Sequence, residues 1–190
     1  RRSSDLFPDN PGNPELWDRM TLMADQAGTH TDLAAAFTTA IEAADLSKED
    51  VAELSARTAR VYDQVLGQPE KAEPFHARVL ANDPLDETAY EALRELYTNA
   101  DRWDDLKVLY RNRIANTVDL SAKLDLLLQV CFLYEDILDD VPMAIRSYQE
   151  VLELEPSHTT SRRALERLYT RAERFRDLVS LLEGDRNDAE

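Results

Sequence analysis

The stretch that decides the fold is 142-PMAIRSYQEVLELEP-156. Its apolar residues recur every three or four positions, which places them on one face of an α-helix. Pro142 suits the first turn of a helix, and Pro156 follows directly after the last periodic positions, where a helix cannot continue. We therefore predict one amphipathic helix here, bounded by a proline at each end.

The sequence around this helix repeats after 72 residues. Residues 61–110, aligned without gaps on residues 133–182, are identical at 17 of 50 positions. Most shared residues are apolar or turn-related, as expected of two segments that fill the same packing roles. A weaker copy at an offset of 73 aligns Trp17 with Tyr90, so the repetition reaches almost to the N-terminus.

Helical spacing and turn residues divide the chain into ten helices joined by short links. The helices pair into five hairpins, which we place at about residues 14–45, 48–82, 86–115, 118–154 and 158–184. A hairpin of this size cannot cover its own apolar stripes and has to stack on its neighbours. The sequence predicts an all-α fold without β-sheet, in which residues 14–184 form one repeat array. We expect residues 1–13 to be an extended arm or linker and residues 185–190 a polar tail.

Two second helices carry the same pattern of a small residue, a larger one, Val-Leu and a closing proline. The pattern comprises Ala72, His76, Val79, Leu80 and Pro84, and again Ala144, Tyr148, Val151, Leu152 and Pro156. Together with the first-helix residues Tyr90, Leu93 and Tyr97, this pattern resembles the tetratricopeptide repeat family. The sequence departs from that family at Arg94 and Glu166, where a small residue is usual. It also has one extra residue before each of the turns that follow the third and seventh helices.

The resemblance implies a right-handed α-α superhelix, or solenoid, that acts as a protein-interaction module or scaffold. A peptide or protein segment would lie in a concave groove lined by the first helix of each hairpin. One alternative is a structural spacer or self-association element of a larger multi-repeat protein, with no groove ligand. A remote alternative is an enzyme or small-ligand protein with an unrecognised site.

Composition argues against several other functions. A net charge of −16 repels phosphate backbones and anionic membranes, so we expect neither nucleic-acid nor membrane binding. The sequence has no phosphate-binding loop, nucleophile elbow or paired metal ligands, so we expect no catalysis, cofactor or metal. We expect His30, His76 and His158 to have structural or solvent-exposed roles and the single cysteine, Cys131, to be buried. One cysteine and no visible signal peptide favour the cytoplasm for a chain that we interpret as a fragment.

The candidate partner-binding residues lie on predicted first helices. Arg163, Arg167 and Arg171 recur every four residues, which puts three guanidinium groups on one helical face, and guanidinium groups suit carboxylates. The resemblance places this face in the groove, with Glu91 and Glu95 at the matching positions of an earlier helix and Leu128 and Phe132 between them. The alternative for the arginines is pairing with nearby acids such as Glu166. The alternative for Leu128 and Phe132 is core packing, because the run around them is apolar nearly all round.

The last predicted helix has an apolar stripe that a following hairpin would normally cover. Its members are Phe175, Leu178, Val179, Leu181 and Leu182. We expect either self-association through this end or a longer parent array.

Overall fold

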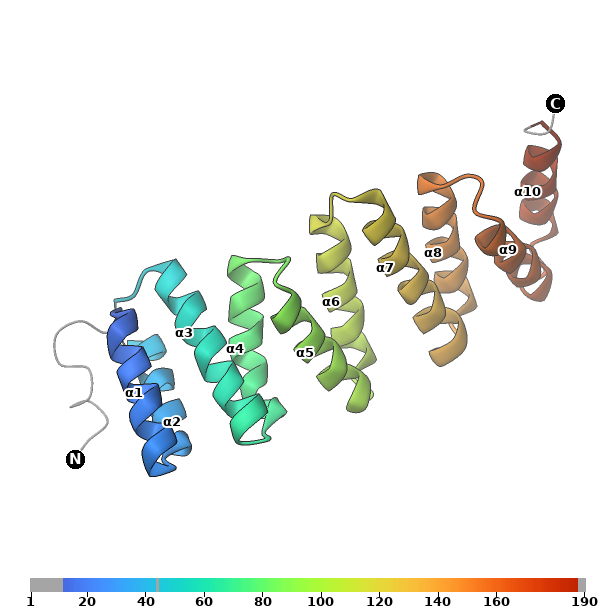
Figure 1. Ribbon diagram of the computed structural model, residues 1–190. Helices are drawn as coiled ribbons and strands as arrows, with labels where there is room; N and C mark the ends of the chain where they lie inside the picture. Colours follow the sequence, from blue (N-terminus) through green and yellow to red (C-terminus); the bar gives the residue numbers. More distant parts are fainter. Residues whose placement is uncertain (1–11, 44, 188–190) are drawn as a thin grey trace. The chain divides into compact units, whose positions relative to one another are not determined.

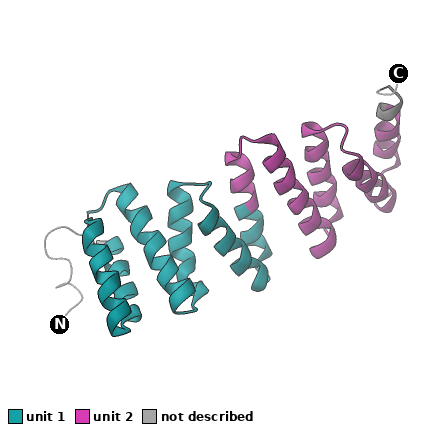
Figure 2. Ribbon diagram, viewed as in Figure 1, with its two compact units in different colours: residues 1–109 teal, residues 110–190 magenta. Residues whose placement is uncertain are grey.

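A computed structural model describes residues 12–43 and 45–187 of the chain. Within them the chain forms α-helices, two short π-helical turns and no strand (Figure 1). They fall into two compact units, one ending at Leu109 and the other beginning at Tyr110, within a single helix (Figure 2). The predicted all-α fold and its ten helices are confirmed for the described residues.

The first unit is built from consecutive antiparallel helices, each packed on the next along the chain from α1 to α5. The helices are α1 (Pro14–Ala27), α2 (His30–Ala43), α3 (Lys48–Arg60), α4 (Pro69–Asn82), α5 (Glu87–Asn99) and α6 (Trp103–Asn116), of which α6 crosses the unit boundary. Its core includes Trp17, Phe37 and Leu54, whose side chains are inaccessible to solvent. Burial of each such side chain stabilises the fold by about 1.5–3 kcal/mol.

The second unit continues the pattern, with α7 packed on α8, α8 on α9 and α9 on α10. Its helices are α7 (Leu120–Phe132), α8 (Val141–Leu154), α9 (Thr159–Arg171) and α10 (Phe175–Asn187). A core cluster of Leu127, Cys131 and Val151 lies between α7 and α8. The prediction of one continuous array, with its outer bounds at residues 14 and 184, stays a prediction. The predicted arm falls mostly on residues 1–11, and the end of the predicted tail on 188–190, all outside the described residues.

Local side chains set the helix ends where the sequence predicts them. The Asn13 side chain accepts a hydrogen bond from the Glu15 backbone N–H at 3.0 Å, and Pro14 opens α1. Gly28 ends α1 at φ +66°, in the left-handed region that glycine enters without strain. α7 begins at Leu120, two residues later than predicted, because Asp119 caps it by accepting from the Ala122 N–H at 2.8 Å.

The extra residues of the sequence are accommodated as π-helical turns. The turn η2 (Val61–Val65) follows α3, and η3 (Leu133–Ile137) follows α7 at the same place in the repeat. In each, the hydrogen bond spans five residues instead of four, from Leu66 N to Val61 O and from Leu138 N to Leu133 O, both at 3.0 Å. A π turn absorbs one additional residue without ending the helix, so both copies keep the same fold around the insertion.

The described residues include no helix long and apolar enough to cross a membrane.

Candidate functional site

The arginine row predicted from the sequence lies on exposed positions of α9. Arg167 pairs with Glu135, and Arg171 donates two hydrogen bonds to Asp139 at 2.8 and 3.0 Å. Both acids precede their arginine by 32 residues and lie in or just after η3, so the C-terminal half of α9 faces η3 and the link that follows it. Pairing with acids, the alternative for this row, therefore occurs for Arg167 and Arg171, but with Glu135 of η3 and Asp139 of the following link and not with Glu166.

Arg163 completes the row one turn earlier, and no ion-pair partner is recorded for it among the described residues. The same offset of 32 residues leads from Arg163 to Cys131, which directly precedes Phe132 in α7. Leu128 is half-buried against the Leu127–Cys131–Val151 cluster, which confirms core packing for this residue. Phe132 leaves 56% of its surface exposed, so core packing is the wrong prediction there. We call this surface the α7–α9 face: Leu128, Phe132, Glu135, Asp139, Arg163, Arg167 and Arg171.

A buried contact anchors the acidic edge of the α7–α9 face. The Glu135 side chain, only 11% exposed, also accepts a hydrogen bond from the Tyr148 hydroxyl of α8 at 2.9 Å. Burial, reinforced by this hydrogen bond and the nearby charge, raises the pKa of Tyr148 above its ordinary value. Glu135 is therefore bonded to side chains of both α8 and α9, and it orients Arg167.

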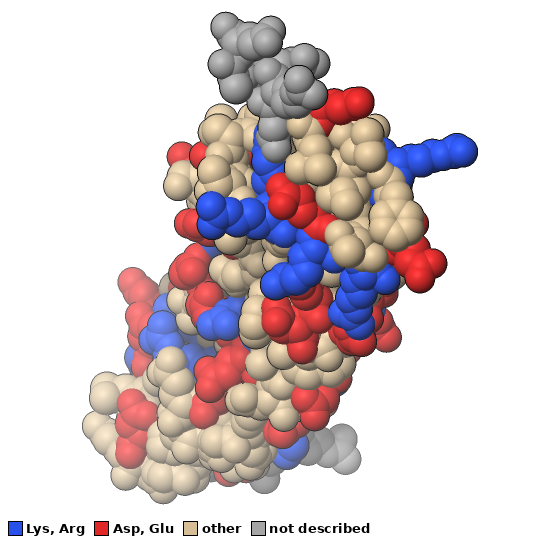
Figure 3. Space-filling view, turned by 90° about the vertical axis from the view of Figure 1, so that its right-hand side faces the viewer, with Lys and Arg blue, Asp and Glu red and all other residues tan. Residues whose placement is uncertain are grey.

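The two predicted acidic residues belong to the other unit. Glu91 and Glu95 lie on α5, where Glu91 accepts from Arg94 at 2.8 Å and Glu95 is exposed. The predicted passage from an acidic through an apolar to a basic end of one groove therefore stays a prediction. Figure 3 shows basic and acidic side chains interspersed on one side of the molecule, without a uniform basic patch.

A second charged network, in the first unit, was not predicted. Arg102, in the link between α5 and α6, donates to Glu73 of α4 at 2.6 and 2.8 Å and to Asp105 at 2.8 Å. The guanidinium also lies over the Tyr97 ring, 4.7 Å from its centroid. The hydrogen bonds from Arg102 lower the pKa of Glu73, whereas burial and the Glu73 charge raise the pKa of Tyr97 to about 12. The sequence spacing of Glu73 and Arg102 does not indicate this network, because they are 29 residues apart. Only their opposite charges could have suggested the pair.

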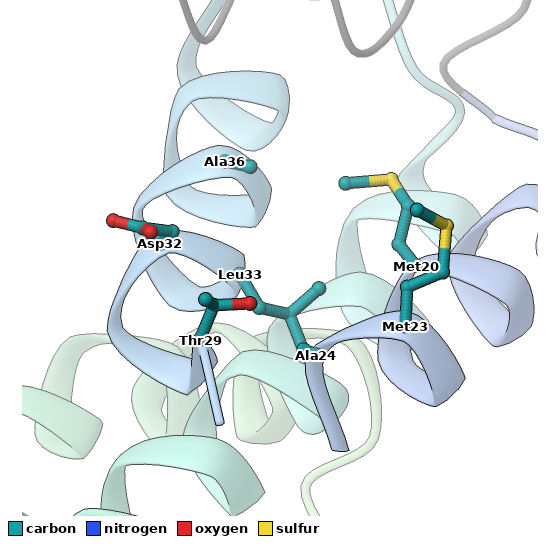
Figure 4. Close-up of a pocket in the computed structure, with 7 residues that line it drawn as sticks. All are labelled: Met20, Met23, Ala24, Thr29, Asp32, Leu33 and Ala36. Atoms are coloured by element: carbon teal, nitrogen blue, oxygen red, sulfur yellow. The ribbon is translucent and has the colours of Figure 1, made fainter. Parts of the chain in front are cut away.

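A small apolar pocket of about 140 Å³ opens between α1 and α2 in the first unit (Figure 4). Met20 and Met23 form one side of it, and Ala24, Leu33 and Ala36 most of the remainder. Asp32 points away from the two methionines. The pocket therefore offers apolar contact and no polar group arranged for chemistry.

The histidines and the cysteine occupy structural positions, as predicted. His76 bonds Asp63, His30 bonds Asp25 at 2.9 Å, and the ring of His158 caps α9. Burial raises the pKa of the Cys131 thiol to about 12, which leaves it protonated and unreactive at neutral pH. The described residues contain no group of three or more His, Cys, Asp or Glu side chains placed to hold a metal ion.

Comparison with solved structures finds low-identity likenesses over most of the chain. A crystal structure of MamA is 14% identical with a TM-score of 0.45, covering 92% of this chain and 89% of MamA. PilF of Pseudomonas aeruginosa is 13% identical with a TM-score of 0.42, covering 89% of this chain and 73% of that one. A tetratricopeptide repeat protein of Parabacteroides merdae is 15% identical with a TM-score of 0.40, covering 96% and 70%. No protein-family model and no curated protein matches the sequence, so the fold assignment rests on the helical hairpins themselves.

Proposed function

We propose that the chain is a protein-interaction module whose α7–α9 face binds a segment of another protein. The observation that carries the proposal is the exposed Phe132 ring, which is adjacent in sequence to the residue that matches Arg163 at the 32-residue offset of the two ion pairs. The exposed Phe132 ring gives a partner apolar area, and the exposed Arg163 guanidinium, which forms no ion pair among the described residues, gives a charged contact. The complementary segment has a large apolar residue within a few positions of a carboxylate. Binding of this kind requires no catalytic group.

Peptide selection tests the proposal even though the partner is unidentified. Random peptides are selected by phage display on the immobilised chain, and the affinity of an enriched peptide is measured by fluorescence polarisation. We expect enriched sequences with an acidic residue close to a large apolar one. Phe132→Ser and Arg163→Ala each weaken binding about tenfold or more, the loss expected of a central contact.

Matched controls come from exposed apolar and arginine residues elsewhere in the second unit. Leu120→Ser removes an exposed apolar side chain from the start of α7, and Arg146→Ala removes an exposed arginine from α8. Both controls leave the affinity unchanged. The proposal fails if the controls weaken binding as much as the test variants, or if no peptide is enriched.

Self-association is a second candidate, supported by α10. Phe175, Val179 and Leu182 are 58%, 51% and 45% exposed and recur at helical spacing, as expected of a face that another helix could cover. Light scattering across a range of protein concentrations tests it. A mass that rises with concentration, and returns to that of a monomer in Val179→Glu, supports self-association, and a monomer throughout contradicts it.

A further inference from the structure

The two copies of the repeat place one arginine in the same local backbone. Arg102 follows Asp101, which has φ +53°, and Arg174 follows Glu173, which has φ +56°. The backbone N–H of each arginine donates to a tyrosine carbonyl, to Tyr97 O at 2.8 Å and to Tyr169 O at 2.9 Å. The chain therefore presents the two side chains from equivalent turns.

The two guanidinium groups also make the same contacts through Nε and with a tyrosine ring. The Nε atoms donate to Asp105 at 2.8 Å and to Asp177 at 2.7 Å, and both groups lie over a tyrosine ring. The guanidinium-to-centroid distances are 4.7 Å at Tyr97 and 5.2 Å at Tyr169. The Nε edge of each guanidinium thus bonds an aspartate in the first turn of the following helix, and the guanidinium plane is held by the tyrosine ring.

The terminal nitrogens of the two guanidinium groups differ in their hydrogen-bond partners. In the first unit the two terminal nitrogens of Arg102 donate to the two carboxylate oxygens of Glu73, a bidentate arrangement. The position equivalent to Glu73 in the second unit is Ile145, a buried apolar residue. The terminal nitrogens of Arg174 have no acceptor among the described residues, and its side chain is 43% exposed.

A pocket lies beside this open end. It has a volume of about 260 Å³ and is lined by Val141, Pro142, Ile145, Arg171, Ala172 and Arg174. That volume is several times the roughly 30 Å³ of one liquid water, so the pocket has room for a carboxylate and its methylene stem. The lining combines an apolar wall with the guanidinium groups of Arg174 and of Arg171, the latter paired with Asp139. A glutamate side chain complements this surface, with its stem on the apolar wall and its carboxylate on the terminal nitrogens of Arg174.

We infer that this pocket binds an acidic side chain of a partner segment, whose carboxylate takes the place on Arg174 that Glu73 takes on Arg102. The inference rests on the proposed function, because it names one anchor of the partner bound there. Arg171 ends the arginine row of the α7–α9 face and also lines the pocket. A segment lying along α9 can therefore reach the pocket with one acidic residue.

Nuclear magnetic resonance of ¹⁵N-arginine-labelled protein tests the inference, with N-acetyl-glutamate α-amide as the probe. We expect the Arg174 Nε–H signal to shift saturably with added probe, while the Arg102 signal, already paired with Glu73, does not move. The same experiment with N-acetyl-leucine amide, which has no carboxylate, gives no shift. No saturable shift at Arg174, or an equal shift at Arg102 and Arg146, overturns the inference.

Two variants and a second probe sharpen the test. Ile145→Glu supplies the carboxylate within the chain and abolishes the Arg174 response. Arg174→Lys keeps the positive charge and, unlike Ile145→Glu, introduces no new buried charged group. It weakens binding of an acidic peptide selected on the α7–α9 face about tenfold, because lysine cannot form the bidentate pair. If N-acetyl-leucine, with a terminal carboxylate, saturates Arg174 and the glutamate probe does not, the assignment to an acidic side chain is wrong. Peptide binding that requires Phe132 and Arg163 but not Arg174 removes this inference and leaves the proposed function standing.

Discussion

Residues 61–110 and 133–182 repeat the same backbone, with a π-helical turn, two residues of positive φ and an arginine over a tyrosine in each. Three charges of α5, however, are reversed in α9. Glu91, Arg94 and Glu95 of α5 correspond to Arg163, Glu166 and Arg167 of α9. The comparison teaches that shared apolar and turn residues hold the hairpins in place, whereas the exposed charges are free to adapt to a partner.

The largest expected effect tests the shared core. Leu93→Ala and Leu165→Ala each remove a buried leucine from equivalent positions, 3% and 1% exposed, and each lowers the free energy of unfolding by about 2–5 kcal/mol. Urea denaturation followed by circular dichroism measures both. Similar losses support equivalent packing in the two copies, and a loss confined to one copy contradicts it.

The next effect concerns the charged network that only the first copy completes. Glu73→Gln removes the carboxylate from Arg102 and lowers the free energy of unfolding by about 1 kcal/mol at neutral pH, a value reduced for the partial exposure of the pair. Glu70→Gln, at a neighbouring exposed position of α4, is the control. A loss equal to that of the control shows that the network adds no stability.

The same variant has a defined pH dependence. The pKa of Glu73 is lowered in the folded chain from 4.5, so its contribution is complete above that value and declines as pH falls through the lowered pKa. The difference in stability between wild type and Glu73→Gln therefore shrinks in acid. Urea denaturation at a series of pH values below 4.5 checks this, and a difference that stays constant across the series would exclude ionised Glu73 as its cause.

A smaller difference is expected at the turn after each π segment. Gly67 has φ +61°, and its counterpart Asp139 has φ +51°. A Cβ atom at residue 67 meets no atom within 4 Å, so Gly67→Ala costs only backbone strain, about 1 kcal/mol. Gly67→Asp costs less, because aspartate tolerates this conformation. Thermal unfolding ranks the two variants, and the reverse order contradicts the equivalence of the turns.

The smallest effect separates binding from stability. Arg171→Ala removes an exposed ion pair and changes the free energy of unfolding by less than about 0.5 kcal/mol. Wild type and variant should therefore unfold together in urea. A larger loss means that the end of the arginine row serves the fold and weakens the case for its role in binding.

The helix ends were predictable because the residues that set them act within a few positions. Ser47 caps α3 through the Asp50 N–H, and Pro69 opens α4, as the sequence indicates. The pairing of Glu73 with Arg102 was not predictable from spacing, because the two residues are 29 positions apart. Comparing residue 73 with residue 145 would have drawn attention to it, since a charged and an apolar residue fill equivalent sites.

The candidate site was predictable in part. Four-residue spacing places the arginine row on one face of α9, but the acids that pair with it lie in η3 and in the link after it, 32 residues earlier. The exposure of Phe132 could not be predicted, because an apolar run shows that a helix is mostly buried without showing which position its neighbours leave uncovered.

The paired π turns also record the history of the chain. An inserted residue lies at the same place in η2 and η3, 72 positions apart. One insertion followed by duplication of the whole double hairpin explains both turns with fewer events than two independent insertions. The π turn is then older than the duplication, whereas the exchange between Glu73 and Ile145 and the charge reversal between α5 and α9 are younger. Divergence after copying left the terminal nitrogens of Arg102 paired with Glu73, whereas those of Arg174 have no acceptor among the described residues.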